Sequence, residues 1–461
     1  MSSRTEKDFL GSLEIPIDAY YGVHTARALG NFTITGVQIN HFPRLIIALA
    51  MVKKASVAAN LEFNLLTVEI AHAIDQACDE IIDGKYHEHF VVDLIQGGAG
   101  TSTNMNANEV IANRALEILG HPKGSYKHLH PNDHVNLSQS TNDVYPTAFR
   151  VGLLLSHAGL MESLEHLINC FRERAELFQA IYKIGRTQLQ DAVPMTLGQE
   201  FMAFADTLKE ETQRFHDLEG LLGEVGLGGT AIGTGINAPK GYASVVCRHL
   251  TEICGFSVTT AANPIEATSD TGIYLTWSGV LRRTATKLSK ICNDLRLLSS
   301  GPRAGFGEIN LPPVQAGSSI MPGKVNPVIP EMVNQVAYQV MGNDLTVMLA
   351  CEGGQLQLNA FEPVMVANLF QSIDIMKRAM RILGDRCVAG ITPNIEHCQK
   401  NLEKSITLVT LLNPQLGYEL SSELAMEALA SNRTIRELVL ERKLMSSEAY
   451  DTLLKESTMI D

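Results

Sequence analysis

The chain has 461 residues, of which 45% are hydrophobic, and its formal net charge at pH 7 is −13. A chain of this length is expected to form two or three domains, and its acidic balance disfavours nucleic acid and anionic membranes as partners. Aromatic residues make up only 6%, which disfavours a β-sandwich, and residues 147–193 contain no proline, which favours long helices. We therefore expect a mainly α protein.

The N-terminal residues lack the apolar segment of a secretion signal, and the longest apolar run, residues 45–52, is too short to span a bilayer. We therefore expect a cytoplasmic protein with no membrane partner. The eight cysteines include no C-x-x-C pair, so we expect buried free thiols.

Residues 1–140 alternate short helical patterns, such as 68–82, with loops, and they are expected to form an N-terminal domain. The loop at residues 96–106 is rich in glycine, hydroxyl and amide side chains, and a second polar loop follows at residues 138–143. A flexible linker would explain the glycines of the first loop, but it explains poorly why apolar positions flank them so closely.

Apolar residues then recur at helical spacing in five long stretches, at about residues 148–182, 194–222, 271–298, 330–352 and 363–384. A helix of about 30 residues is about 45 Å long, which is more than one domain of this size can cover. We therefore predict a five-helix bundle within residues 141–396 that is shared between subunits. A small helical C-terminal domain is expected over residues 397–461.

Two further polar loops accompany these helices. Residues 185–191 connect the first two, and residues 317–327 follow the third with the sequence Gly-Ser-Ser-Ile-Met-Pro-Gly-Lys-Val-Asn-Pro. Two glycines and two prolines prevent a helix in the second loop. It is not a phosphate-binding P-loop, because five residues separate Gly317 from Gly323 and Val325 stands where that motif requires a hydroxyl.

The segment 317–327 resembles the signature of the aspartase/fumarase superfamily. Three further superfamily motifs occur in the expected order: Gly-Gly-Ala-Gly-Thr-Ser (97–102), Ser-Gln-Ser-Thr-Asn-Asp (138–143) and Gly-Arg-Thr-Gln-Leu-Gln-Asp-Ala (185–192). The resemblance covers essentially the whole chain. It implies a three-domain fold whose central bundle is shared across a homotetramer, with loops from three subunits building each active site.

Within the superfamily, the chain is more similar to the aspartase branch. Fumarases carry a histidine where this chain has Gln188, and glutamine cannot take up a proton to activate water. The segment after the signature, which contains Glu331, also resembles aspartases. The resemblance thus implies anti elimination of ammonia from L-aspartate to give fumarate. Fumarate hydratase and a non-catalytic structural relative are the alternatives.

The resemblance also implies residue roles. Ser318 would be the base that removes the C3 proton of the substrate. It implies no cofactor; Mg²⁺ as an activator is not readable from the sequence, and no metal ligands are expected, because His87 and His89 look solvated rather than ligating. The implied substrate ligands are Thr101, Ser140, Thr141 and Ser319 for the β-carboxylate, Lys324 and Asn326 for the α-carboxylate, and Asn142, Thr187 and Gln188 for the amino group.

Overall fold

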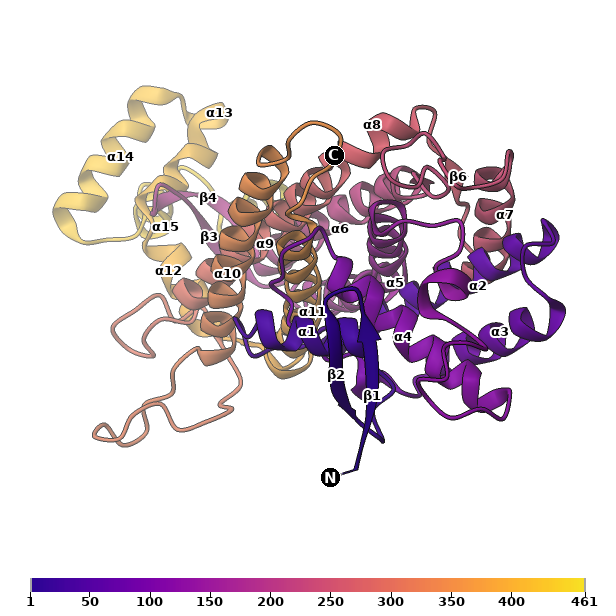
Figure 1. Cartoon of the computed structure of the whole chain (residues 1–461). Coiled ribbons are helices and arrows are strands. Elements are labelled where there is room, and N and C mark those ends of the chain that lie inside the picture. The colour runs from indigo at the N-terminus through magenta and orange to yellow at the C-terminus, as the bar shows by residue number, and fades with distance from the viewer. Residues whose placement is uncertain (1, 460–461) are drawn as a thin grey trace. The chain divides into compact units, whose positions relative to one another are not determined.

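The computed structural model describes residues 2–459, and these are mainly helical (Figure 1). The strands there form four two-stranded sheets: β1 (Ser3–Asp8) with β2 (Gly11–Pro16), β3 (Tyr182–Thr187) with β4 (Gln190–Thr196), β5 (Glu224–Val225) with β6 (Thr259–Thr260), and β7 (Ile309–Asn310) with β8 (Thr392–Pro393). The prediction of a mainly α protein is confirmed.

Five long helices correspond to the five predicted stretches: α5 (Thr141–Leu177), α6 (Leu197–Leu222), α9 (Gly272–Leu298), α10 (Val328–Glu352) and α11 (Glu362–Arg386). The prediction placed the start of α5 too late, at residue 148, after Pro146, and its end too late, at about residue 182. Pro146 lies inside α5, and the helix therefore lacks one backbone hydrogen bond at this residue.

The remaining helices are shorter. They are α1 (Val23–Asn31), α2 (Pro43–Glu62), α3 (Val68–Ile82), α4 (Thr101–Ile118), α7 (Tyr242–Cys254), α8 (Pro264–Ser269), α12 (Ile395–Lys404), α13 (Asn413–Leu416), α14 (Tyr418–Ser431), α15 (Ile435–Glu441) and α16 (Ser447–Glu456). Short 3-10 or π segments lie at Ile39–His41, His87–His89, Pro131–Val135, Val388–Gly390 and Ile406–Leu412.

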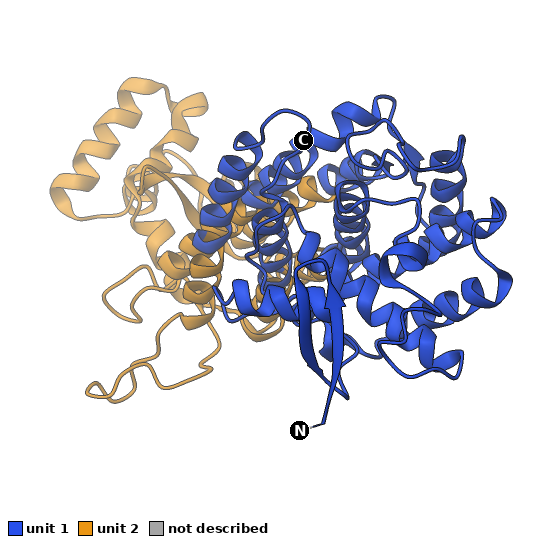
Figure 2. Cartoon of the chain, in the orientation of Figure 1, with its two compact units in different colours: residues 1–161, 213–283, 338–376 blue, residues 162–212, 284–337, 377–461 orange. Residues whose placement is uncertain are grey.

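The described chain divides into two compact units (Figure 2). Each of the five long helices contributes residues to both units. The three-domain division of the sequence remains a prediction. Unit 1 consists of residues 1–161, 213–283 and 338–376, and unit 2 of residues 162–212, 284–337 and 377–461.

In unit 1, α2 packs against α3 and α7. Twelve of its residues are buried, including Lys53, so apolar positions surround much of the helix rather than forming one stripe. In unit 2, Ile184 of β3 packs with the apolar residues of α14 and α15. This cluster gives the β3–β4 hairpin a rigid base.

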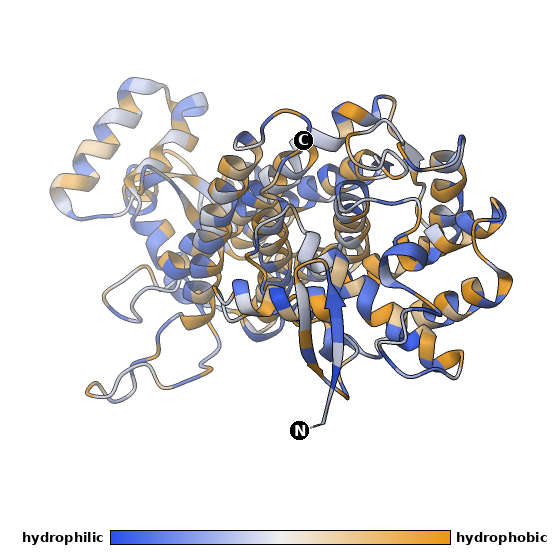
Figure 3. Ribbon diagram, in the orientation of Figure 1, coloured by the Kyte–Doolittle hydropathy of each residue, from blue (hydrophilic) through white to orange (hydrophobic). Residues whose placement is uncertain are grey.

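Hydrophobic and hydrophilic residues both occur along the long helices (Figure 3). No helix among residues 2–459 is long and apolar enough to cross a membrane. All eight cysteines are free thiols, as expected, and six of them are buried, whereas Cys254 and Cys351 are only half-buried.

Candidate active site

In unit 1, the first polar loop leads directly into the N-terminus of α4. Gly98 and Gly100 have φ values of +89° and +87°, a region that glycine adopts without strain. A Cβ on Gly100 would lie 2.5 Å from the ring of Tyr145, so no larger residue fits there. Thr101 is exposed and is the first residue of the helix, where the helix dipole favours an anion. The backbone N–H groups of Thr101 and Thr103 already donate to the Gly98 carbonyl and to the Gln96 side chain.

The second polar loop, residues 138–142, brings a second helix N-terminus close to the first. The Asn104 side-chain amide of α4 donates a 3.0 Å hydrogen bond to the Thr141 hydroxyl at the start of α5. The Asn142 amide donates to the Ala231 carbonyl at 2.8 Å, and the Asn142 backbone N–H donates to the Ser140 hydroxyl at 3.2 Å. The predicted residues of unit 1 therefore lie on loops that hydrogen bonds connect.

The Asp143 side chain fixes the backbone of the second polar loop. Its carboxylate accepts hydrogen bonds from the backbone N–H groups of Ser140 at 2.9 Å, Gly228 at 3.0 Å and Thr230 at 3.0 Å. Burial raises the pKa of Asp143 to about 6, although these hydrogen bonds and the charge of Lys53 oppose the shift. The glycine-rich segment after α6 is thereby fixed against the start of α5.

Lys53 supports the second polar loop, a role that the sequence reasoning missed. It lies on α2, is fully buried, and donates to the side-chain oxygens of Asn136 and Gln139, both at 2.9 Å. Burial lowers its pKa to about 7. A lysine within an otherwise apolar helical run was the only sequence signal for this role.

In unit 2, Thr187 and Gln188 lie at the exposed tip of the β3–β4 hairpin. The prediction of a plain loop over residues 185–191 was wrong, because Thr187 pairs with Gln190 across a two-residue turn. Gln188 and Leu189 have φ values of 52° and 64°, as a type I′ turn requires. Gln-Leu is not one of the pairs that usually indicate this turn, so the hairpin was not readable from the sequence.

Buried charges anchor the hairpin. Glu308 is fully buried, and its two carboxylate oxygens lie 2.7 Å from Lys183 Nζ and 2.7 Å from Arg186 Nη1. Lys183 also pairs with Glu200 at 2.6 Å, and the Arg186 guanidinium lies 4.3 Å from the ring centre of Phe306. These contacts fix the strand that ends at Thr187.

The segment 317–327 is non-helical, as predicted, and closes on itself. The Gly317 N–H donates to the Lys324 carbonyl at 2.9 Å, and the Asn326 amide donates to the Gly317 carbonyl at 2.7 Å. A Cβ on Gly317 would lie 2.6 Å from that Lys324 oxygen, so glycine is required for the closure. Lys324 and Ser319 are exposed on this loop.

Ser318 has the surroundings that a serine base requires. Its hydroxyl oxygen accepts hydrogen bonds from the backbone N–H groups of Ile320 at 3.2 Å and Met321 at 3.0 Å. Two N–H donors on one oxygen stabilise negative charge on it and lower the cost of forming an alkoxide. The neighbouring residue Ile320 is 83% exposed, so this loop leaves apolar surface accessible to solvent.

His87 and His89 do not share a ligand site. The Nε2 atom of His87 lies 2.8 Å from the Ile81 carbonyl, and the ring of His89 packs on Tyr20 with 4.9 Å between ring centres. Both rings are used in local packing.

Comparison with known proteins identifies the family. The family model described as "Lyase" matches residues 11–342, and the one described as "Fumarase C C-terminus" matches residues 408–461. The aspartate ammonia-lyase of Pseudomonas aeruginosa is 58% identical over 460 residues, covering 100% of this chain and 97% of that protein. The enzyme of the same name from Escherichia coli K12 is 52% identical, covering 98% of this chain and 94% of that protein.

Solved structures agree with this result. A crystal structure titled fumarate lyase:delta crystallin, from Brucella melitensis and bound to cobalt, has a TM-score of 0.96 and 56% identity, covering 98% of each chain. A class II fumarase from Schistosoma mansoni has a TM-score of 0.92 at only 36% identity, also covering 98% of each chain. The chain therefore belongs to the aspartase/fumarase superfamily of lyases, as its four sequence motifs predicted.

Proposed function

We propose that this protein is an aspartate ammonia-lyase that converts L-aspartate to fumarate and ammonia. The observation that carries this proposal is its full-length identity of 52–58% to enzymes of that name. Gln188 at the hairpin tip supports the same choice, because its amide can hydrogen-bond an amino group but cannot act as a base toward water.

Ser318 is the proposed base. As an alkoxide it removes one proton from C3 of L-aspartate, and the electron pair moves into the β-carboxylate to form an enediolate. The pair then returns to form the C2–C3 double bond while the C2–N bond breaks. The amino group leaves as ammonia, because it was bound as ammonium, and the proton on Ser318 passes to solvent.

The enediolate carries two negative charges, so its stabilisation determines the rate. The N-termini of α4 and α5, with the hydroxyls of Thr101, Ser140 and Thr141, supply neutral donors for the β-carboxylate, together with Ser319 of the signature loop. Lys324 and Asn326 are assigned to the α-carboxylate, and Asn142, Thr187 and Gln188 to the amino group. Lys324 provides the fixed cation that an acidic protein needs at such a site.

We further propose that the enzyme is a cytoplasmic homotetramer that needs no cofactor for the chemical step. Support for assembly comes from α10, where a stripe of apolar residues at helical spacing is exposed. Tyr338 is 57% exposed, Leu345 54% and Leu349 59%. Activity measured with and without added Mg²⁺ tests whether this ion activates the enzyme.

The deciding experiment follows the ultraviolet absorbance of fumarate. The purified enzyme should release fumarate from L-aspartate and release it at most slowly from L-malate. Comparable rates from both substrates would instead assign fumarate hydratase. No turnover of either substrate by a folded tetramer would assign the non-catalytic alternative.

A further inference from the structure

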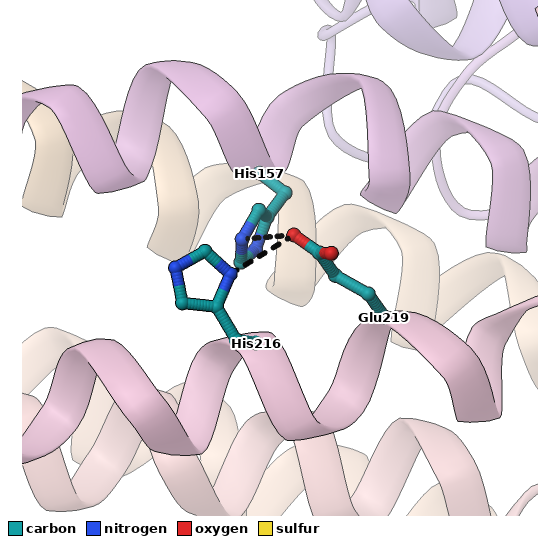
Figure 4. Close-up of side chains that lie close together, drawn as sticks. All are labelled: His157, His216 and Glu219. Atoms are coloured by element: carbon teal, nitrogen blue, oxygen red, sulfur yellow. Dashed lines mark ion pairs between the residues drawn. The ribbon is translucent and has the colours of Figure 1, made fainter. Parts of the chain in front are cut away.

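Two histidines and a glutamate converge between α5 and α6, within unit 1 and on residues to which no substrate role is assigned (Figure 4). His157 projects from α5, and His216 and Glu219 project from the same face of α6, three residues apart. One ligand atom from each side chain lies within 4.8 Å of the others. Oε1 of Glu219 is 2.7 Å from Nε2 of His157 and 3.4 Å from Nδ1 of His216.

His157 is buried, and its two ring nitrogens lack hydrogen-bond partners. Its side chain is only 7% exposed, and neither ring nitrogen makes a hydrogen bond of acceptable direction, despite the short distance to Glu219. A buried polar atom without a partner is costly, and a neutral imidazole with a free lone pair is a metal ligand.

We propose that His157, His216 and Glu219 form a binding site for a divalent transition-metal ion of the Zn²⁺ type. Two imidazoles, one carboxylate and a water molecule are a ligand set that zinc sites use. The nitrogen ligands exclude Mg²⁺ as the preferred ion, since that ion takes oxygen ligands. The site links α5 to α6 and is a property of the fold that is separate from the elimination reaction.

The three ligand atoms lie within 4.8 Å of one another, so side-chain rotations are needed to reach the geometry of a zinc site. Tetrahedral ligands at about 2.0–2.1 Å from zinc are about 3.3 Å from one another. The His216–Glu219 distance of 3.4 Å already fits, and the His157–Glu219 distance of 2.7 Å must widen. Glu219 can rotate to allow this, because its side chain is 44% exposed, and His216 is 51% exposed. The same exposure gives the ion a route in and leaves room for the water ligand.

The chain contains its own reporter for this site. Trp277 is the single tryptophan in the sequence, is fully buried, and its ring centre lies 5.8 Å from that of His157. A Co²⁺ ion bound by His157 would therefore quench most of the tryptophan fluorescence of the protein. Co²⁺ accepts the same ligands as Zn²⁺ and adds visible absorption bands that report nitrogen and oxygen coordination.

The experiment titrates full-length, chelator-treated enzyme with Co²⁺ in the absence of substrate. We expect saturable quenching of Trp277 with one ion per chain, displacement of Co²⁺ by Zn²⁺, and no displacement by Mg²⁺. Zn²⁺ should also raise the Tm, because a ligand that binds only the folded state stabilises it.

Glu219→Gln and His216→Gln each remove one ligand from a half-exposed position and should weaken Co²⁺ binding by about 10- to 100-fold or more. His72→Gln, which changes an exposed histidine of α3 outside the cluster, is the matched control and should bind as the wild type does. Unaltered metal-free tryptophan spectra would show that the variants are folded. Co²⁺ affinity equal to wild type in both ligand variants, or no quenching by Co²⁺ up to about 100-fold molar excess, overturns the proposal. Because substrate is absent, neither result depends on the proposed lyase activity.

Discussion

At the scale of single residues, the surroundings of Ser318 favour the role of base that is proposed for its hydroxyl. The N–H groups of Ile320 and Met321 both point at its oxygen. These donors are fixed by the backbone of the loop, so they need no reorganisation when charge develops. The positive charge of Lys324 on the same loop would add to their effect when the loop is covered and water is excluded.

Ser318→Ala should reduce kcat for deamination by about 10²- to 10⁴-fold, the usual contribution of a general base. L-Aspartate should still bind, because the hydroxyl acts only in the transition state. Steady-state kinetics and calorimetric binding would measure the two effects. Full activity of Ser318→Ala together with inactivity of Ser319→Ala would move the base to the neighbouring serine.

Lys324→Met should raise KM for L-aspartate by about 30- to 150-fold, because a charge-assisted hydrogen bond to a buried carboxylate contributes about 2–3 kcal/mol. Lys324→Arg, which keeps the charge but changes its geometry, is the control and should recover part of the affinity. A KM for Lys324→Met that stays near the wild-type value would show that another group binds the α-carboxylate.

The lowered pKa of Lys53 predicts how the free energy of unfolding depends on pH. Its pKa of about 7 in the folded protein lies below the value of about 10.4 for an exposed lysine. The unfolded chain therefore binds more protons between these values, and this residue makes the free energy of unfolding rise with pH by up to about 1.4 kcal/mol per unit. Lys53→Met should lack that rise. Urea unfolding of both proteins at pH 7, 8 and 9 measures the difference, and parallel pH dependences would contradict it.

At the scale of elements, the β3–β4 hairpin shows how buried charge positions exposed polar residues. Thr187 and Gln188 are solvent-exposed, whereas the strand behind them is held by Glu308, Lys183 and Arg186. The hairpin tip thus derives its rigidity from contacts several residues away.

Glu308→Gln should destabilise the protein by about 3–5 kcal/mol, because it leaves Arg186 without its carboxylate partner and buried Lys183 with Glu200 alone. Activity should fall as well, since Thr187 loses its anchored strand. Glu441→Gln removes a solvent-exposed ion pair with Arg433 and should cost less than about 1 kcal/mol. Equal unfolding midpoints for the two variants in urea would refute this role of Glu308.

Helical periodicity predicted the five long helices because their apolar residues recur along a face over many turns. The same method delayed the start of α5 to residue 148, since a proline inside a helix costs free energy that only packing can offset. It also missed the β3–β4 hairpin, whose turn depends on two residues in positive φ. Both errors concern local conformations that tertiary contacts stabilise against the local preference of the sequence.

The candidate site could be predicted only in part from the sequence. Motif similarity named the loops that carry Thr101, Thr141 and Ser318, but it assigned no role to Lys53 and none to Asp143. Their roles follow from burial and from partners distant in the chain, such as Gly228. The cluster of His157, His216 and Glu219 is a further example, because its members belong to two helices and no short motif contains them.

At the scale of the whole molecule, a net charge of −13 opposes the approach of a substrate that carries two carboxylates. In the proposed site, the N-termini of α4 and α5 and the side chain of Lys324 would supply the positive potential that attracts the carboxylates. Assembly is the second requirement, since the resemblance assigns the loops of one site to three subunits. Subunit assembly would bury the exposed apolar stripe of α10.

The double variant Leu345→Glu, Leu349→Glu tests this stripe. If α10 lies in a subunit interface, two charges there would replace about 3–6 kcal/mol of apolar burial per subunit with a desolvation penalty. The tetramer should therefore dissociate in analytical ultracentrifugation, and activity should be lost with it, because no single subunit completes a site. Leu429→Glu is the control: Leu429 lies on α14, is 68% exposed, and belongs to the small C-terminal helices rather than to the bundle. A double variant that sediments as a fully active tetramer would place the interface on other helices, whereas an active monomer would refute the shared site itself.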